Sequence, residues 1–232
     1  MKTVKYNKTL ELNEFIVSSD TCVIYFHGGG LEAGSKDDFN NLAKYFNENE
    51  IDCYLPSYRL YPKAKYPEFI LDAAEAVAYV LNKRKYQKVF IGGTSAGAYL
   101  AMMLYFDKRY LAKHKIDSET ITGYIFDAGQ PTVHFHVLRE SGMDTRRIVV
   151  DERAPMYYLT QNVDSKVKFL VFYAEFDLNT RKEETELLKH LMINYGYPKE
   201  NLNFQYVKDN NHCQYTNTDF FNETVLKFIK NS

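Results

Sequence analysis

The sequence has few cysteines, no excess of basic residues and no long apolar run. Its three cysteines leave at least one thiol unpaired and show no spacing typical of a metal site. Lysine and arginine (29 residues) are balanced by aspartate and glutamate (30 residues), which argues against the basic face that binds nucleic acid. No window approaches the roughly 20 apolar residues that span a bilayer. We therefore expect no nucleic-acid partner and no membrane partner.

The first residues of the chain are polar, and Met1 to Tyr6 lack the apolar stretch of a signal peptide. We therefore expect a cytoplasmic protein.

Cys22 and Cys53 stand in apolar runs typical of strands, so both are predicted in the core. The basic run Lys83-Arg84-Lys85 is typical of the last turn of a helix, where cations meet the negative end of the helix dipole.

Short apolar runs alternate with helical patterns through most of the chain. Strands are predicted over 21–26, 51–57, 88–92, 121–126, 167–173 and 202–207, with one or two edge strands before them. Helices are predicted over 35–47, 67–81, 96–106, 181–195 and 219–229. This alternation implies crossover connections, and hence an α/β fold with a mostly parallel central sheet flanked by helices. Because we find no repeat and no flexible linker, we expect one domain over residues 1–232.

One segment, from about residue 130 to 163, is too long for a simple connection between two strands. Insertions of this kind are usually functional, so we interpret it as a small cap-like insertion. We expect a small, partly aromatic substrate pocket lined by His134, Phe135, Tyr157 and Tyr158. The alternative is that residues 156–159 only pack a short helix onto the sheet.

The pentapeptide Gly93-Thr94-Ser95-Ala96-Gly97 matches the pattern G-x-S-x-G. It follows a predicted strand and opens a predicted helix, where a sharp turn between small residues pushes a serine outward. The amino-terminal end of that helix also favours developing negative charge. Taken alone, the pentapeptide is equally consistent with a tight glycine turn that packs a helix on a sheet.

A second glycine-rich motif, His27-Gly28-Gly29-Gly30, ends a different predicted strand. Ester hydrolysis requires backbone N–H donors for an oxyanion, and glycines allow a substrate to approach the backbone closely. A phosphate-binding loop is the alternative, but no G-x-x-x-x-G-K-[ST] pattern follows. The two motifs together predict a serine hydrolase with Ser95 as its nucleophile.

These motifs resemble the hormone-sensitive-lipase-type branch of the α/β hydrolases, which includes small carboxylesterases and acetyl esterases. The resemblance extends from about Val23 to Ile229 and includes Gly34-Ser35, the run Tyr58-Arg59-Leu60-Tyr61-Pro62, Pro67 and Asp72. It implies an α/β-hydrolase fold with oxyanion donors from the amides of Gly29, Gly30 and Ala96, and Gly28 as a further candidate.

The base and the acid follow the serine in this fold, in the order Ser, acid, His. Among the six histidines, His212 alone follows the last predicted strand, on the polar loop 209–212, and we predict it as the base rather than a solvated loop histidine. The acid is expected after the penultimate strand, where Glu175 and Asp177 are available. The family pattern G-x-x-D-x-L selects Asp177, with Ala174 in place of the usual glycine. Cys213, next to the base, is predicted as a bystander.

The predicted function is hydrolysis of small, short-acyl carboxylic esters through an acyl-enzyme, with no metal and no organic cofactor. Larger relatives carry an N-terminal cap, whereas about twenty residues precede the first buried strand here, so we expect a minimal cap and small acyl groups. An amidase, peptidase or formamidase of the same fold is the alternative. A non-catalytic binding protein is disfavoured because such proteins usually lose a triad member or the oxyanion glycines. The partner is a small-molecule ester, and the sequence leaves open whether copies of the chain form a homo-oligomer.

Overall fold

The computed structural model describes residues 1–163, 165–178 and 180–232. Its strands are β1 (Lys2–Lys5), β2 (Glu11–Phe15), β3 (Thr21–Phe26), β4 (Asp52–Pro56), β5 (Lys88–Thr94), β6 (Gly123–Asp127), β7 (Lys168–Phe176) and β8 (Leu202–Asn211). Its α-helices are α1 (Asn40–Glu48), α2 (Glu68–Lys83), α3 (Ala96–Phe106), α4 (Arg109–Ala112), α5 (Phe135–Glu140), α6 (Arg181–Asn194) and α7 (Asp219–Lys230). Short 3-10 helices cover Lys36–Phe39, Ser118–Thr120, Pro155–Tyr158 and Lys199–Asn201. Within this part of the chain, every helix is too short or too polar to cross a membrane.

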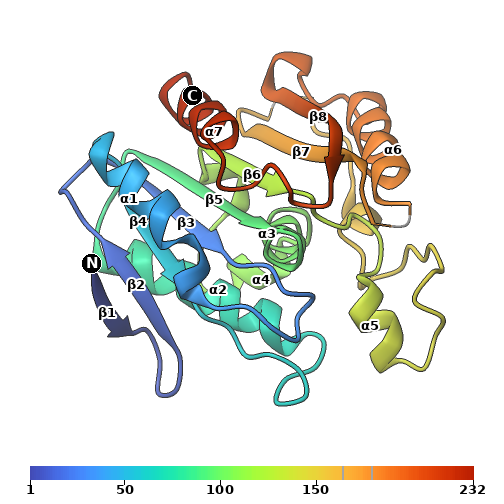
Figure 1. Cartoon of the computed structure of the whole chain (residues 1–232), viewed down its shortest axis with the longest axis horizontal. Helices are drawn as coiled ribbons and strands as arrows, with labels where there is room; N and C mark the ends of the chain where they lie inside the picture. Colours follow the sequence, from blue (N-terminus) through green and yellow to red (C-terminus); the bar gives the residue numbers. More distant parts are fainter. Residues whose placement is uncertain (164, 179) are drawn as a thin grey trace.

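The described strands form one sheet in the order β1-β2-β4-β3-β5-β6-β7-β8 (Figure 1). The pairs β1–β2 and β2–β4 are antiparallel, and all the other pairs are parallel. The prediction of a mostly parallel α/β sheet with one or two edge strands before it is thus confirmed. Because β3, β5, β6, β7 and β8 run in the same direction, the loops that follow them gather at one edge of the sheet.

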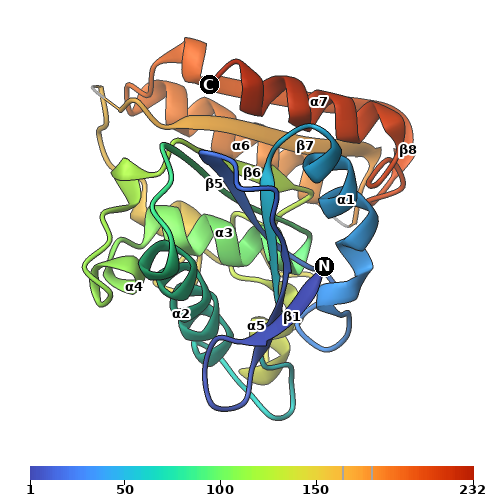
Figure 2. The ribbon, with the colours of Figure 1, turned by 90° about the vertical axis from the view of Figure 1, so that its left-hand side faces the viewer.

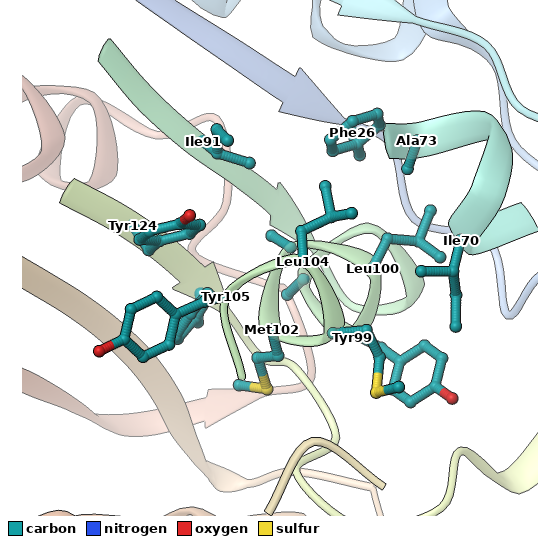
Figure 3. Close-up of a cluster of buried hydrophobic side chains, with 14 of the residues drawn as sticks. Phe26, Ile70, Ala73, Ile91, Tyr99, Leu100, Met102, Leu104, Tyr105 and Tyr124 are labelled. Atoms are coloured by element: carbon teal, nitrogen blue, oxygen red, sulfur yellow. The ribbon is translucent and has the colours of Figure 1, made fainter. Parts of the chain in front are cut away.

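Helices cover both faces of the sheet and bury two separate cores. One core is formed with α2, α3, α4 and α6, and the other with α1 and α7 (Figure 2). All residues of α3 are buried. Figure 3 shows its side chains pointing toward several elements, with Leu100 and Leu104 near Phe26 and Tyr105 near Tyr124. An α-helix that is apolar all round belongs inside a protein, and this burial holds the start of α3 firmly at the sheet edge.

Local sequence explains where several elements begin and end. Ser35 and Asp38 form the predicted capping box, although the helix that follows starts as a 3-10 turn before it continues as α1. The basic run 83–85 does close α2, and its Arg84 pairs with the buried carboxylate of Asp52. Cys22 and Cys53 are both buried, as expected.

The segment between β6 and β7 contains α5 and the 3-10 helix Pro155–Tyr158. In Figure 1, α5 lies at one side of the molecule, below α6. Met156 and Leu159 are buried in the core that includes α3. Residues 156–159 therefore pack a short helix into this core, as in the alternative interpretation, although its partner is α3 rather than the sheet itself.

Candidate active site

Ser95 stands in a strained turn between β5 and α3. Its backbone has φ 54° and ψ -111°, a positive φ that side-chain-bearing residues rarely adopt. The neighbouring glycines are required because a Cβ on Gly97 would lie 2.2 Å from the Phe26 carbonyl oxygen, and one on Gly93 2.4 Å from the Gly97 carbonyl carbon. The Ser95 amide donates to the carbonyl oxygen of Asp127 at 2.7 Å. The turn is thus fixed by its neighbours, as the pattern G-x-S-x-G predicts.

The structure brings Ser95, His212 and Asp177 into one hydrogen-bonded row. His212 Nε2 lies 2.9 Å from Ser95 Oγ, and His212 Nδ1 lies 2.5 Å from Asp177 Oδ1. Because an ionised carboxylate can only accept, Nδ1 carries the proton and Nε2 faces the serine hydroxyl as an acceptor. The three side chains come from the ends of three different strands, β5, β7 and β8, so the sheet edge assembles the row.

Asp177 is held as a carboxylate in this row. Its side chain is fully buried, which by itself would raise its pKa, but the hydrogen bond and charge of His212 and the charge of Arg181 outweigh burial and lower the pKa. The Leu178 amide also donates to Asp177 at 2.7 Å. Glu175 instead accepts from the Asp209 amide at 2.9 Å, in an exposed position. Between the two candidate acids, therefore, the structure places Asp177 against the histidine.

The polar stretch before His212 was predicted as a loop, but β8 continues through it to Asn211. Asn211 is paired with Phe176 across an irregularity in the ladder between β7 and β8. The strand therefore extends beyond its apolar part because β7 provides a partner, which the polar sequence does not indicate. His212 follows this strand directly.

The loop after β3 offers backbone donors to the same space. Gly29 and Gly30 have φ values of +103° and +64°, and a Cβ on Gly29 would lie 2.1 Å from the Ala33 carbonyl oxygen. Within the described residues, neither the Gly29 nor the Gly30 amide has a hydrogen-bond acceptor. The Ala96 amide belongs to the first turn of α3, where N–H groups lack acceptors within the helix. Gly29, Gly30 and Ser95 line the same cleft, and Ala96 directly follows Ser95.

His27 and Tyr58 fix the shape of this loop. The Tyr58 hydroxyl donates to the His27 carbonyl oxygen at 2.8 Å, and the two rings stack with centroids 4.3 Å apart. His27 Nδ1 donates to the Gly28 carbonyl oxygen at 2.7 Å. Burial lowers the pKa of His27, so the ring is neutral and serves as a structural prop.

Arg59 anchors the segment that carries Tyr58. Its guanidinium contacts both carboxylate oxygens of Asp72 and also pairs with Glu68 at 2.9 Å. Because Asp72 is buried and Glu68 begins α2, the pairs attach the segment to that helix. The Tyr-Arg-Leu motif therefore supports the glycine loop 27–30, which its residues alone did not reveal.

Asp127 was not predicted as a site residue. It ends β6 and is fully buried, and its Oδ2 accepts hydrogen bonds from Thr94 at 2.8 Å and from Thr216 at 2.7 Å. Burial raises its pKa to about 6, and the two hydroxyl donors only partly oppose this effect. It thus connects the residue before Ser95 to the loop after His212. The only signal in the sequence is a carboxylate directly after an apolar strand, next to the strand that leads to Ser95.

Of the four residues predicted to line the substrate pocket, the structure brings only Phe135 to the cleft. This cleft of about 480 Å³ is lined by Ser95, His212, Phe135, Leu178 and the glycine loop, among others. His134 is fully buried below it, against Tyr99. Tyr157 is 56% exposed, and Tyr158 donates to the Glu152 carbonyl oxygen at 2.8 Å, so both lie elsewhere. The reason is that the 3-10 helix turns Met156 to the core and Tyr157 outward, while Tyr158 packs partly buried against that core.

Cys213 borders the cleft but shows no sign of activation. Burial raises the pKa of its thiol, and the nearby carboxylates of Asp127 and Asp177 raise it further. A nucleophilic cysteine requires the opposite, a lowered pKa. The thiol therefore stays protonated.

The comparisons with known proteins agree with this architecture. A sequence profile of the α/β-hydrolase fold family matches residues 23–213. A kynurenine formamidase from Scheffersomyces stipitis is 32% identical over 111 residues, which cover 44% of this chain and 41% of that protein. A kynurenine formamidase from Saccharomyces cerevisiae is 29% identical over 99 residues, which cover 40% of this chain and 38% of that protein. The match thus spans less than half the length of either relative.

Solved structures of the same shape include esterase 2 of Thermogutta terrifontis. The native enzyme superposes with a TM-score of 0.79 at 17% identity, covering 99% of this chain and 90% of that chain. Its propionate-bound form gives a TM-score of 0.81 at 17% identity, covering 99% and 93%. At this identity the likeness shows the fold. With the profile match over most of its length, the chain belongs to the α/β-hydrolase fold family, in the hormone-sensitive-lipase-type branch that its motifs predicted.

Proposed function

We propose that this chain is a serine hydrolase that cleaves small, short-acyl carboxylic esters. The observation that carries the proposal is the row in which Ser95 Oγ lies 2.9 Å from His212 Nε2 and Asp177 Oδ1 lies 2.5 Å from His212 Nδ1. A serine hydroxyl becomes a strong nucleophile when a neighbouring base accepts its proton, and a buried carboxylate holds that base in the required tautomer.

In the proposed reaction, His212 Nε2 takes the Ser95 proton while Oγ bonds to the carbonyl carbon of the ester. The negative charge that forms on the carbonyl oxygen is stabilised by the amides of Gly29, Gly30 and Ala96. His212 then gives its proton to the departing alcohol, and the acyl group stays on Ser95. Water repeats the sequence: His212 takes its proton, the oxygen attacks the acyl carbon, and Ser95 leaves with a proton again.

Two features support small acyl groups. A Cβ on Gly30 would lie 3.2 Å from the Phe135 ring, so this aromatic side chain stands close beside the oxyanion loop. The cleft itself is about 480 Å³ and includes Phe39 and Leu178 as further bulky residues. Phe135 therefore narrows the space beside the oxyanion loop, which favours a small acyl group there over a long chain.

Hydrolysis of a formamide bond is the second candidate. It is supported by the similarity to proteins named kynurenine formamidase, although the match covers less than half of them. The same row of side chains serves this reaction, with formyl as the smallest acyl group and an amine as the leaving group that His212 protonates.

The test is a panel of p-nitrophenyl esters from acetate to octanoate together with an aryl formamide. We expect turnover to fall with chain length and to be lost in Ser95→Ala. Ser232→Ala is the matched control because it removes a serine hydroxyl away from the cleft. Ser232 lies beside Lys88, whose side chain donates to its carbonyl oxygen, and Lys88 starts the strand that leads to Ser95 at its other end. Turnover of Ser95→Ala at the level of the parent protein would refute the mechanism, and a preference for octanoate would refute the small-acyl assignment.

A second measurement is independent of the substrate. A fluorophosphonate probe should add one phosphonyl group to the peptide that contains Ser95, and mass spectrometry would locate it. Labelling should be lost in Ser95→Ala and strongly slowed in His212→Ala, since the base that activates the serine is then missing. Unchanged labelling in both variants would contradict the proposed roles.

A further inference from the structure

A second hollow adjoins the cleft at Phe135 and Leu178, which line both spaces. Its volume is about 290 Å³. Its other lining residues include several polar or charged ones: Gln130, Arg146, Arg147, Thr180, Arg181 and Glu184. Three guanidinium groups and one carboxylate therefore face a space that lies next to the proposed nucleophile.

Arg181 is the buried charge of this hollow. It begins α6 and is 3% exposed, and it donates to the Ala128 carbonyl oxygen at 2.6 Å and to Gln130 Oε1 at 3.1 Å. Both acceptors are neutral. Across the described ranges, no carboxylate oxygen lies within 4.0 Å of its guanidinium. A buried guanidinium without a directly paired anion is unfavourable, so an anion that enters the hollow would be attracted to it.

The single acidic residue of the hollow is already engaged. Glu184 accepts hydrogen bonds from the hydroxyls of Thr132 at 2.6 Å and Thr180 at 2.8 Å, so its oxygens do not pair with the arginines. Arg146 forms an ion pair with Asp144 at 2.6 Å. Arg147 is exposed, and its side chain forms no ion pair with the residues that the structure describes. Arg147 thus has no ion-pair partner among the described residues. Arg181 acts on Asp177 and Glu184 through its charge but forms no direct ion pair with either of them.

The start of α6 adds to this positive potential. Its first turn follows Thr180, and helix N-termini attract anions through free N–H groups and the helix dipole. The hollow therefore combines a buried cation, a solvent-facing cation and a helix end, and it shares its wall with the cleft that contains Ser95.

We propose that this hollow binds a carboxylate carried by the substrate, on the leaving group of the ester or formamide. The assignment rests on the proposed function, which puts the scissile carbonyl at Ser95. Because the acyl group of that substrate is small, the carboxylate belongs to the departing half of the molecule. It passes between Phe135 and Leu178 and is held by Arg147 and Arg181. The substrate class is thus a small-acyl ester or formamide of an anionic alcohol or amine.

The test compares 3-acetoxybenzoate with its neutral counterpart 3-acetoxybenzamide, which have the same acetyl group and nearly the same shape. The kcat/KM ratio of the anionic to the neutral ester is measured for the parent protein, Arg147→Gln and Arg109→Gln. Arg109 is an exposed arginine paired with Asp107, so its loss changes the net charge equally, outside the hollow. We expect Arg147→Gln to lower the ratio about fivefold, mainly through KM, and Arg109→Gln to leave it unchanged.

Added salt should reduce the ratio for the parent protein more than for Arg147→Gln. Salt screens the attraction between Arg147 and the substrate carboxylate, and the variant lacks this attraction. Benzoate should also inhibit hydrolysis of the neutral ester competitively, with a higher inhibition constant in Arg147→Gln. An unchanged ratio and an unchanged inhibition constant in Arg147→Gln would overturn the carboxylate site, provided that hydrolysis is lost in Ser95→Ala. Hydrolysis that persists in Ser95→Ala would instead overturn the proposed function itself.

Discussion

Asp127 leads to a prediction about stability and pH. Its carboxylate is fully buried, and while Oδ2 accepts hydrogen bonds from Thr94 and Thr216, Oδ1 has no partner among the described residues. Burial raises its pKa from the ordinary 3.8 to about 6. The folded protein therefore holds this proton more tightly than the unfolded chain, and its free energy of unfolding falls as the pH rises from about 4 to 6.

The size of the effect follows from the pKa difference. One pKa unit corresponds to about 1.4 kcal/mol, so a rise from 3.8 to about 6 makes the ionised Asp127 cost about 3 kcal/mol at neutral pH. Between about pH 4.5 and pH 7.5 the free energy of unfolding should fall by roughly 2 kcal/mol through this group. The rest of the cost arises below about pH 4.5, because Asp127 of the unfolded chain is already largely ionised there. Asp127→Asn has the shape of the protonated acid and does not titrate, so it should lack this loss.

Urea unfolding of the parent protein and of Asp127→Asn at both pH values measures the effect as a difference of differences. The baseline cost of the substitution and the titration of all other groups then cancel. Asp20→Asn, which removes a carboxylate from an exposed position, is the matched control. If the stability difference between the parent protein and Asp127→Asn changes by less than about 0.5 kcal/mol between the two pH values, the assigned pKa is wrong.

Three further predictions concern residues in and beside the cleft. Asp177→Asn should lower kcat for p-nitrophenyl acetate by ~10⁴ because the wrong tautomer of the histidine is favoured, whereas Glu175→Gln should remain active; the opposite result would reverse the assignment of the acid. Gly29→Ala should abolish turnover, since its Cβ would lie 2.1 Å from a carbonyl oxygen at a φ of +103°. Gly142→Ala is the control, because Gly142 has a φ of +70° but no atom within 4 Å of the added Cβ. This variant should keep its activity and lose about 1 kcal/mol of stability in thermal unfolding. Cys213→Ala should remain active, and iodoacetamide should react slowly at about pH 8 because the pKa of the thiol is raised; rapid alkylation would contradict this.

The sheet could be predicted because each buried parallel strand carries its own signal. Strand β3 has the predicted bounds, and α3 begins and ends at the predicted residues. Both are dictated locally, the strand by a continuous apolar run and the helix by small and apolar residues after a glycine turn. The row of Ser95, Asp177 and His212 could be predicted for a related reason, since parallel strands place their following loops at the same edge.

Features that depend on a neighbour in space could not be predicted. Asn211 lies in a strand because β7 pairs with it, although its own stretch is polar. Tyr157 and Tyr158 do not line the cleft because their turn packs on the core beside α3, with Met156 buried, Tyr158 against that core and Tyr157 exposed. Asp127 shows its role only when Thr94 and Thr216, which are far apart in the sequence, meet at its carboxylate.

The inserted segment is joined to the segment that follows the glycine loop 27–30, and this has a consequence for the specificity that we propose. Arg139 of α5 donates to Glu32, which follows the glycine loop, at 2.8 Å, and Glu140 accepts from the Tyr66 amide at 3.1 Å. The same helix begins with Phe135, whose ring stands against Gly30. The side chain that narrows the cleft is thus joined through α5 to the segment that follows the glycine loop 27–30. In the proposed function the Gly29 and Gly30 amides hold the oxyanion, so a change in α5 that breaks the Arg139–Glu32 pair should alter acyl selectivity and turnover together.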